Sequence, residues 1–579
     1  MNNEDSSFKN LFLPFTSKKA VFWIILLGFL VFFNSLFGLP IWDDNVYIFS
    51  NQSLSNFNFF YLFGQNVYNV GQYYRPLTAA YFSFLLNLFG NTYFFYHLIQ
   101  LLMHIANTVL VFIFLKKLLK KEFAFFAALL FLVHPFQVES VAWISGSIVP
   151  FSFLFGISGL LLLTRKKLTY KALSLSAFLF LLSILSRETG IFFVALAVCY
   201  ILLFRKDGTL RVFIYGVVLS VVYLLIRLSF HITSLSANYP YPIDRLDFAQ
   251  RLINIPLITL YYVRNLFIPD ALATDQQWVV RSINLPYFFI PLIFDFVFFA
   301  LIAAAGFFIY RKAEENIKKY FFFLIWFLLG FGILFQIVPL DMTVADRWMY
   351  FPLVGLLGIL GLFAQTFSNK FKLHENKVFL IFILMAVFFS VFTLVRNSQW
   401  NNSITLFSND IKINNNFDVE NQLGAELAIQ GRYKEALPIL LDSHKKNLED
   451  SNIFDIAGCY KQLGNIKLAE KYYEEIIINK DNIKIRPVVK QNTYNEMAKL
   501  LILHEDPEVN AVFLKRAVKE YTANSTFWAF YAITEYNLGN KPEALAFAKN
   551  AYGLNPNNST NQLLQNIKAN KAAQLKLLN

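Results

Sequence analysis

Cysteine and charge are the two things this sequence has little of. Only two of its 579 residues are cysteine, Cys199 within an apolar run and Cys459 in the polar C-terminal part, so no disulfide framework is indicated. Charged residues make up 15% of the chain, whereas 56% of it is hydrophobic and 67 residues are phenylalanine. A soluble globular protein does not carry this much apolar mass, so the composition predicts a polytopic membrane protein.

The motifs of several soluble enzyme classes are also absent from the sequence. It contains no glycine-rich phosphate-binding loop, no paired-cysteine zinc pattern, no His-Glu-x-x-His sequence and no nucleophile elbow. Gly355, Gly358 and Gly361 lie within an apolar stretch, where small residues are typical of close helix packing. These absences argue against a soluble nucleotide-dependent enzyme and against an ATP-driven pump.

The few charges are distributed unevenly along the chain. Residues 1–396 contain 30 Lys and Arg against 18 Asp and Glu, a net charge of +12, and residues 397–579 contain 21 against 20. The basic excess therefore belongs to the apolar part and to loops that would face anionic lipid. It does not indicate nucleic-acid binding.

All 17 lysines of the apolar part fall in six basic clusters, which alternate with pairs of apolar stretches. The clusters lie at residues 9–19, 116–121, 165–171, 205–211, 311–319 and 370–377. The positive-inside rule places these clusters, with the N-terminal segment 1–19, in the cytoplasm. The interruptions within each pair then lie outside, and they include Asp43, Asp44, Arg187 and Glu188.

About eleven membrane-spanning helices fit this alternation. We expect them near residues 20–40, 94–115, 123–133, 148–163, 172–186, 189–204, 212–230, 288–310, 320–338, 353–366 and 378–395. The expected membrane domain is 20–396, with a retained first span because no small-residue cleavage site follows it. Its long outside loops, 41–93 and 231–287, contain aromatic segments at 56–68 and 252–268 that are typical of helices lying in the membrane interface.

The C-terminal part repeats with a period of about 34 residues. Small residues recur in one series, and in a second series glycine precedes alanine by five residues. The first series is Gly424, Gly458, Ala498 and Ala532, and the second begins at Gly431, Gly464 and Gly539. This pattern resembles tetratricopeptide repeats, in which small residues let two helices approach. We expect a linker at 397–417 and about four repeats at 418–579, so the whole chain is expected to be all-α.

The outside loops collect residues that could carry chemistry. They are Asp43, Asp44, Arg75, His134, Glu139, Arg187, Glu188, Asp341, Asp346 and Arg347. A carboxylate can act as a general base, and the planar guanidinium of arginine suits a phosphate. Together they favour transfer from a lipid-linked phosphate donor. Each arginine by itself is more simply an interfacial anchor, except that Arg187 and Glu188 interrupt a long apolar stretch. His97 and His104 are interpreted as core histidines.

Six motifs, taken in order, resemble a known family. They are Trp42-Asp43-Asp44, Tyr74-Arg75-Pro76-Leu77-Thr78, Phe95-Tyr96-His97 with His104 and Asn107-Thr108, His134-Pro135 with Val138-Glu139-Ser140-Val141-Ala142, Ser186-Arg187-Glu188-Thr189-Gly190, and Ala345-Asp346-Arg347-Trp348-Met349-Tyr350-Phe351-Pro352. The family is that of the transmembrane and tetratricopeptide repeat-containing O-mannosyltransferases and their bacterial relatives, within the GT-C glycosyltransferase superfamily. Two departures stand out: Arg187 occupies a position where lysine is common, and Ser145-Gly146-Ser147 lacks the charged residues expected there.

The resemblance implies a GT-C fold, a polyprenyl- or dolichyl-phosphate sugar donor and an inverting mechanism. It implies that Asp43 or Asp44 is the catalytic base and that Arg75 holds the donor phosphate, with Arg187 and Arg347 as weaker candidates. The further candidates for the site are His134, Glu139, Glu188, Asp346 and Tyr350. No spacing demands a metal, although carboxylates beside a phosphate can recruit a divalent cation.

Our interpretation is a membrane enzyme that moves a mannose-like sugar to a hydroxyl on the extracytoplasmic face, with a protein acceptor held by the repeats. A glycan or lipid acceptor is the first alternative. A non-catalytic membrane-anchored scaffold and a transporter of lipid-linked sugars are alternatives of other classes. By the resemblance, the membrane is the bacterial inner membrane with periplasmic repeats, and the endoplasmic reticulum is the other option.

Overall fold

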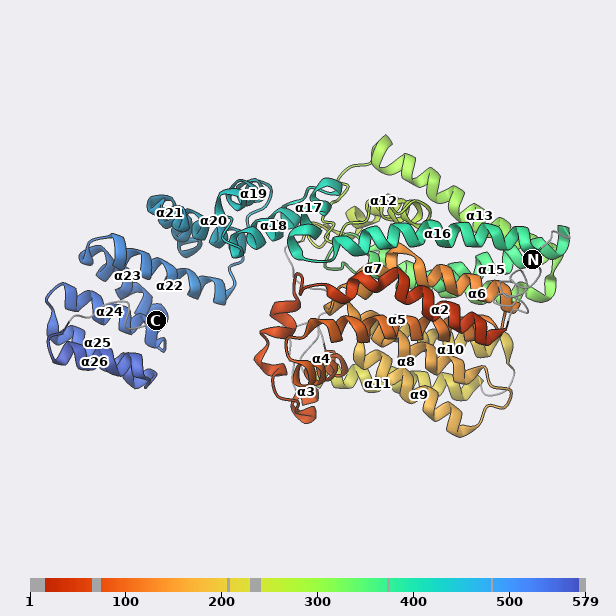
Figure 1. Cartoon of the computed structure of the whole chain (residues 1–579), viewed down its shortest axis with the longest axis horizontal. Helices are drawn as coiled ribbons and strands as arrows, with labels where there is room; N and C mark the ends of the chain where they lie inside the picture. Colours follow the sequence, from red (N-terminus) through yellow and green to blue (C-terminus); the bar gives the residue numbers. More distant parts are fainter. Residues whose placement is uncertain are drawn as a thin grey trace, which may run out of the picture. The chain divides into compact units, whose positions relative to one another are not determined.

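The computed structural model describes residues 16–64, 74–205, 209–229, 241–371, 375–480 and 483–571. Within these ranges the chain is helical, with one isolated β-bridge between Gln276 and Val344. It divides into two compact units, Met1–Asn414 and Asn415–Asn579 (Figure 1). The all-α class expected from the sequence is confirmed.

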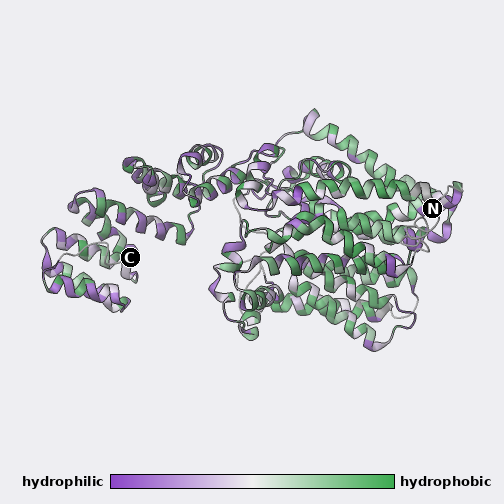
Figure 2. Cartoon of the chain, in the orientation of Figure 1, coloured by the Kyte–Doolittle hydropathy of each residue, from purple (hydrophilic) through white to green (hydrophobic). Residues whose placement is uncertain are grey.

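The first unit is a bundle of apolar helices (Figure 2). Within the described ranges, seven helical segments are long and apolar enough to cross a membrane. They are Ser17–Phe37 (α2 and η1), Tyr93–Leu115 (α5), Ser145–Leu163 (η5 and α8), Leu285–Lys312 (η7 and α13), Glu314–Phe335 (η8, α14 and η9), Pro352–Phe371 (α15) and Phe379–Gln399, which is most of α16 (Glu375–Gln399). The chain is therefore a multi-pass membrane protein.

The other four expected spans coincide with helices that are bent or short. Helix α6 (Lys121–Val133) and the segment Pro135–Ala142, which contains η4 and α7, form a pair bent by 54° and would make an eighth span if counted together. The shorter apolar helices are α9 (Tyr170–Ser186), Glu188–Phe204 (η6 and α10) and the part Ile214–Ser229 of α11 (Thr209–Ser229). A further short apolar helix, α4 (Pro76–Phe89), lies in the first expected outside loop. The total of eleven stays a prediction.

Glycines let two of the long helices approach closely, as the sequence indicated. A Cβ atom on Gly355 of α15 would lie 2.5 Å from the backbone nitrogen of Phe327 on α14. One on Gly358 would lie 2.3 Å from the ring of Phe323. Any larger residue at these two positions would therefore push α15 away from α14.

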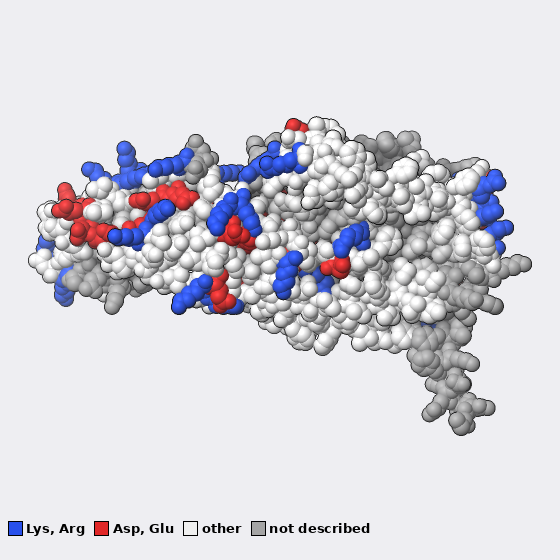
Figure 3. Space-filling view, turned by 90° about the horizontal axis from the view of Figure 1, so that it is seen from above, with Lys and Arg blue, Asp and Glu red and all other residues white. Residues whose placement is uncertain are grey.

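The basic clusters meet at one end of the first unit. The Lys116 ammonium donates to Ser17 Oγ over 3.0 Å, and the Lys120 ammonium donates to Asn369 Oδ1 over 2.9 Å. The ring contact between Phe204 and Phe322 brings the cluster that follows Phe204 and the cluster that precedes Phe322 to the same end. Basic side chains also gather at one end of the largely uncharged surface in Figure 3. Because α2 starts at this end, the chain reaches Asp43 at the opposite end.

The loops at that opposite end contain ordered helices. Helix α12 (Phe248–Phe267) begins with a capping box formed by Asp247 and Gln250, and it covers most of the expected segment 252–268. Helix α3 (Phe59–Gly64) lies within the expected segment 56–68 and exposes 87% of Phe60. Residues 65–68 of that segment and residues 231–240 of the second loop lie outside the described ranges.

Much of the stretch expected to be a linker, 397–417, belongs to the first unit. Helix α17 (Ser403–Ile413) follows α16 and is held by an ion pair of 2.7 Å between Arg396 and the fully buried Asp410. Trp400 is buried as well, and the Asn401 carbonyl accepts a hydrogen bond of 3.0 Å from the Leu39 backbone. The chain thus leaves the first unit from the end that carries Asp43.

The second unit consists of four antiparallel helix pairs and a closing helix, as expected for tetratricopeptide repeats. The pairs are α18 (Phe417–Ile429) with α19 (Tyr433–Lys446), α20 (Asp450–Gln462) with α21 (Ile466–Ile478), α22 (Pro487–His504) with α23 (Pro507–Glu520), and α24 (Ser525–Asn537) with α25 (Lys541–Leu554), and α26 (Asn558–Lys568) follows. Gly431, Gly464 and Gly539 turn three of the pairs with φ values of 76°, 80° and 85°, a backbone conformation that favours glycine. The third pair turns between His504 and Pro507 without glycine.

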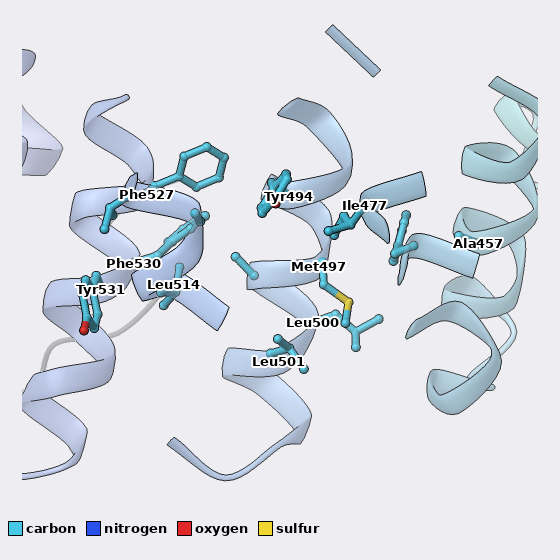
Figure 4. Close-up of a cluster of buried hydrophobic side chains, with 14 of the residues drawn as sticks. Ala457, Ile477, Tyr494, Met497, Leu500, Leu501, Leu514, Phe527, Phe530 and Tyr531 are labelled. Carbon is cyan, nitrogen blue, oxygen red and sulfur yellow. The ribbon is translucent and has the colours of Figure 1, made fainter. Parts of the chain in front are cut away.

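A continuous apolar core joins neighbouring repeats. Tyr494 and Leu501 of α22 pack with Leu514 of α23 and Phe527 of α24 (Figure 4). Each pair covers the apolar face of the next, so the unit is stabilised mainly by contacts between adjacent repeats.

Candidate active site

The turn after the first span places two adjacent carboxylates in different surroundings. Trp42 has a φ of +58°, which is uncommon for a bulky residue and is a strained conformation. Its ring stacks on Trp143 with ring centroids 5.1 Å apart, which compensates for part of this strain. Asp43 and Asp44 follow directly.

Asp44 is buried and engaged in hydrogen bonds. Its Oδ2 accepts from the Ile41 backbone over 2.9 Å, and its Oδ1 accepts from the backbone and the hydroxyl of Ser145 over 2.8 and 2.5 Å. Burial raises the pKa of Asp44 to about 6, and these hydrogen bonds limit the rise. Asp44 therefore ties the first outside loop to the loop that contains Ser145.

Asp43 has a different environment. Its Oδ1 is buried and, within the described part of the chain, accepts no hydrogen bond. Burial raises the pKa of Asp43 to about 7, the negative charges of Asp44 and Asp341 add to the rise, and the Arg347 guanidinium opposes it. A carboxyl with a pKa near neutrality and a spare acceptor atom is suited to taking up a proton.

Arg75 and Glu188 form an ion pair that joins two distant helices. Arg75, the cap of α4, donates through Nε and Nη2 to Glu188 Oε2, both over 2.9 Å. The Thr78 hydroxyl donates to the Ser186 carbonyl over 2.7 Å and holds α4 against the end of α9. Glu188 Oε1 is buried and has no hydrogen-bond partner among the described residues.

Arg187 is the arginine of this site with an unengaged side chain. No described residue forms a hydrogen bond or ion pair with its guanidinium. Burial lowers the pKa of Arg187 to about 10, and the positive charges of Arg75 and Arg347 contribute. Since Arg187 still carries its charge at neutral pH, it can bind an anion.

Arg347 is held on several sides. Its Nη1 pairs with Glu139 Oε1, its backbone nitrogen donates to Glu139 Oε2 over 2.7 Å, and its Nη2 lies 3.6 Å from Asp341 Oδ2. Its Cζ also lies 5.4 Å from the ring centre of Trp143. Burial alone would lower the pKa of Arg347, but the two carboxylates reverse this effect and raise it.

Asp346 faces the second outside loop. Its Oδ1 accepts a hydrogen bond of 2.7 Å from the hydroxyl of Tyr261 on α12, which itself accepts from Gln276 over 3.0 Å. Burial raises the pKa of Asp346 above its ordinary value, and the negative charge of Glu139 adds to this rise. Asp346 connects α12 with the segment that carries Arg347.

Most of the expected site residues thus form one electrostatic cluster. The charge of Arg347 shifts the pKa of both Asp43 and Arg187. The charges of Arg75 and Glu188 also shift the pKa of Arg187. The members of this polar cluster are Asp43, Asp44, Arg75, Glu139, Arg187, Glu188, Asp341, Asp346 and Arg347. They come from five separate parts of the sequence.

Two expected site residues are part of the framework instead. His134 Nδ1 accepts from the Phe136 backbone over 3.2 Å, and its Nε2 lies 3.1 Å from the Leu266 carbonyl, so both nitrogens are occupied. Tyr350 is fully buried, and its hydroxyl contacts His104 Nδ1 and Asn107 Nδ2, each over 3.0 Å. Neither side chain has a free polar atom for a substrate.

The sequence did not indicate three residues of the site. Trp143 supports Trp42 and Arg347, Ser145 holds Asp44, and Tyr261 holds Asp346. Trp143 and Ser145 directly follow the motif that ends at Ala142, so their position was a usable signal. Tyr261 carried no signal because it lies in the middle of an amphipathic helix.

No group of three or more His, Cys, Asp or Glu side chains within the described ranges is arranged to hold a metal ion. Metal dependence therefore stays a question for experiment.

The fold and the polar cluster define a class: a multi-pass helical membrane protein with an acid–arginine site at one end, followed by tetratricopeptide repeats. No family model matches the chain. The chain is similar to the protein O-mannosyl-transferases named TMTC3. It is 25% identical to the mouse protein over 519 residues, which cover 81% of this chain and 54% of that protein. It is 24% identical to the human protein over 441 residues, 69% of this chain and 47% of that one.

A further relative is the protein O-mannosyl-transferase F38B6.6 of Caenorhabditis elegans, 25% identical over 396 residues, which cover 63% of this chain and 52% of that protein. The chain spans about half the length of these curated relatives. Among solved structures, the TPR domain of P58(IPK) aligns with a TM-score of 0.21 and 11% identity over 73% of this chain and 98% of that domain. The helix pairs themselves, and not this likeness, define the repeat fold.

Proposed function

We propose that this protein is a membrane glycosyltransferase of the GT-C type, which transfers mannose from a polyprenyl-phosphate donor to a serine or threonine hydroxyl of a protein. The observation that carries the proposal is that one cluster contains a buried carboxylate oxygen on Asp43 and a half-buried guanidinium on Arg187, and that no described residue forms a hydrogen bond with either. The names of the relatives support the sugar and the protein acceptor.

Asp43 is proposed as the general base. The acceptor hydroxyl gives its proton to Oδ1 of Asp43 while its oxygen attacks the anomeric carbon of the sugar. The bond between that carbon and the phosphate oxygen breaks on the opposite side, so the configuration is inverted and polyprenyl phosphate leaves. The buried setting of Asp43 supports this role, because a pKa near 7 matches a base that works at neutral pH.

Arg187 is proposed as the main ligand of the donor phosphate, with Arg75 beside it. The resemblance pointed first to Arg75, but Arg75 is already paired with Glu188, whereas no described residue pairs with Arg187. The leaving phosphate gains negative charge as the sugar departs. A preorganised guanidinium stabilises that charge more in the transition state than in the bound donor.

Asp44 is proposed as a positioning residue. It accepts three hydrogen bonds and so has little capacity left for an acceptor hydroxyl. Its bonds to Ser145 fix the turn in which Asp43 sits. This assignment separates the roles of two adjacent acids that the sequence left equivalent.

The repeat unit is proposed to bind the protein acceptor, because arrays of helix pairs offer extended surfaces for polypeptides. We place the polar cluster and the repeats on the extracytoplasmic side, in agreement with the positive-inside rule. The membrane is proposed to be a bacterial inner membrane, with the endoplasmic reticulum as the alternative. Participation of a divalent cation is tested by adding a chelator to the assay.

The test is transfer of labelled mannose from polyprenyl-phosphate mannose to a pool of secreted proteins by the purified full chain in detergent. We expect label on serine and threonine residues with the wild type, and its loss with Asp43→Asn. Arg187→Gln should instead raise the donor KM and lower kcat, because its guanidinium is proposed both to bind the donor and to stabilise the leaving phosphate. Transfer to lipid or glycan, but not to protein, would support the first alternative acceptor.

The absence of transfer from any phosphate-linked sugar, with all variants indistinguishable from the wild type, would contradict the proposal. In that case the membrane part would be an anchor and the repeats the working part of a scaffold. Donor movement across vesicle membranes without any acceptor would indicate a transporter.

A further inference from the structure

Arg347 has less freedom to bind a ligand than any other arginine of the polar cluster. Its two terminal nitrogens face Glu139 and Asp341, and its Cζ lies 5.4 Å from the ring centre of Trp143 and 5.7 Å from that of Trp348. Only 9% of its side chain is exposed. A phosphate would have to displace carboxylates from both nitrogens, so a role as donor ligand does not fit this geometry.

A stack of aromatic rings connects Arg347 with the base. Trp143 contacts Arg347 and also stacks on Trp42, the residue before Asp43, with ring centroids 5.1 Å apart. The ring of Trp400 lies 6.4 Å from that of Trp143 and covers it further. The strained backbone of Trp42 is therefore held by rings that Arg347 helps to fix.

The charges that face Asp43 belong to three side chains from two parts of the chain. Asp44 is its neighbour in sequence, and Asp341 and Arg347 come from the loop between α14 and α15. Of these three side chains, Arg347 is the one whose charge favours the ionised form of Asp43. Glu139 neutralises part of that charge through its ion pair with Arg347.

We propose that Arg347 is a positioning residue for Asp43, which holds the loop of the base through Trp143 and Trp42 and keeps its carboxylate ionised. The inference rests on the proposed role of Asp43 as the base. Arg347 and Arg187 then have different tasks in one cluster: Arg347 acts on the base, and Arg187 acts on the donor.

The test is the pH dependence of kcat for mannose transfer by the full chain in detergent. With wild type, kcat falls below about pH 7 because Asp43 must be deprotonated to act. Arg347→Gln removes the favourable charge, so the pKa of Asp43 rises and the acidic limb moves to higher pH by roughly one unit. Glu139→Gln removes one of the two carboxylates that compensate the Arg347 charge, so the limb moves to lower pH.

The two variants should shift the acidic limb of the kcat profile in opposite directions although both break the same ion pair. This difference separates an effect of the Arg347 charge from the loss of the pair itself. A purely structural pair would give losses in both variants with the acidic limb unchanged, and that result would overturn the inference. A raised donor KM in Arg347→Gln without a shift of the limb would overturn it too, since Arg347 would then be a phosphate ligand. Arg187→Gln is the matched control, with a raised donor KM, a lowered kcat and an unshifted limb.

A third variant leaves the buried ion pair of Arg347 and Glu139 intact, and it serves as the test if Arg347→Gln and Glu139→Gln do not fold. Asp341 is 33% exposed, and its negative charge disfavours the ionised form of Asp43. Asp341→Asn should therefore move the acidic limb to lower pH, and a limb that stays in place would contradict the inference. An inactive wild type would instead count against the proposed function.

Discussion

The repeat unit and the polar cluster of the first unit are held together over very different distances along the chain. In the repeats, Arg486 pairs with Asp450 across 36 residues, and Lys461 with Glu496 across 35. In the polar cluster, Ser145 holds Asp44 across 101 residues, and Arg347 pairs with Glu139 across 208. The repeat unit is therefore built from neighbouring modules, whereas the polar cluster exists only when most of the first unit is folded.

The repeat unit and the polar cluster also use their charged side chains differently. Asp450 of the repeats accepts hydrogen bonds from the backbone and side chain of Arg486, so this pair joins two adjacent repeats. In the polar cluster, Asp43 and Arg187 keep bonding capacity that no described residue uses. A buried polar atom without a partner, such as Asp43 Oδ1, is uncommon in folded proteins and marks a place where a ligand is expected.

The largest expected effect separates the two adjacent acids of the cluster. Asp43→Asn should lower kcat by a factor on the order of 10²–10⁴ without changing thermal stability, because no hydrogen bond to its Oδ1 is lost. Asp44→Asn should instead destabilise the first unit by about 1–3 kcal/mol, because an amide cannot replace both acceptor oxygens. Mannose transfer and thermal unfolding of the full chain measure the two effects. Equal effects of the two variants on both readouts would show that the acids share one role.

A cavity in the repeat core should have a large but local effect. Leu514 of α23 is fully buried in the core that α23 forms with α22 and α24. Leu514→Ala should therefore destabilise this region by about 2–5 kcal/mol. Hydrogen exchange should accelerate in these helices and much less in α18 and α19. The donor KM should not change. Uniform acceleration over the whole chain would contradict the modular character of the repeat unit.

The smallest effect concerns a single turn. Gly464 has a φ of +80° and no atom near the position of a Cβ, so Gly464→Ala should cost about 1–2 kcal/mol through backbone strain alone. Gly458 is the matched control because it is helical and equally open, so Gly458→Ala should be neutral or stabilising by up to about 1 kcal/mol. Thermal unfolding of the repeats measures both variants. A loss at Gly458 equal to that at Gly464 would mean that space, and not φ, limits these positions.

Long apolar runs and the repeat period were readable from the amino-acid sequence, because both follow from local periodicity. The seven long membrane-spanning segments and the four helix pairs lie where the sequence indicated. The same reasoning missed α17, because a helix that packs on the first unit through Arg396 and Asp410 does not differ in composition from a polar linker.

The acid–arginine set at the end of the bundle was also predictable, since the residues interrupt apolar stretches on one side of the expected membrane. Their individual roles were not predictable. Asp43 and Asp44 are equivalent in the sequence, and only the hydrogen bonds from Ser145 and Ile41 leave Asp43 as the unengaged acid. Arg75, Arg187 and Arg347 were ranked by motif alone. Folding decided which of them has no partner among the described residues, because the carboxylates that engage Arg75 and Arg347 lie 113 and 208 residues away along the chain.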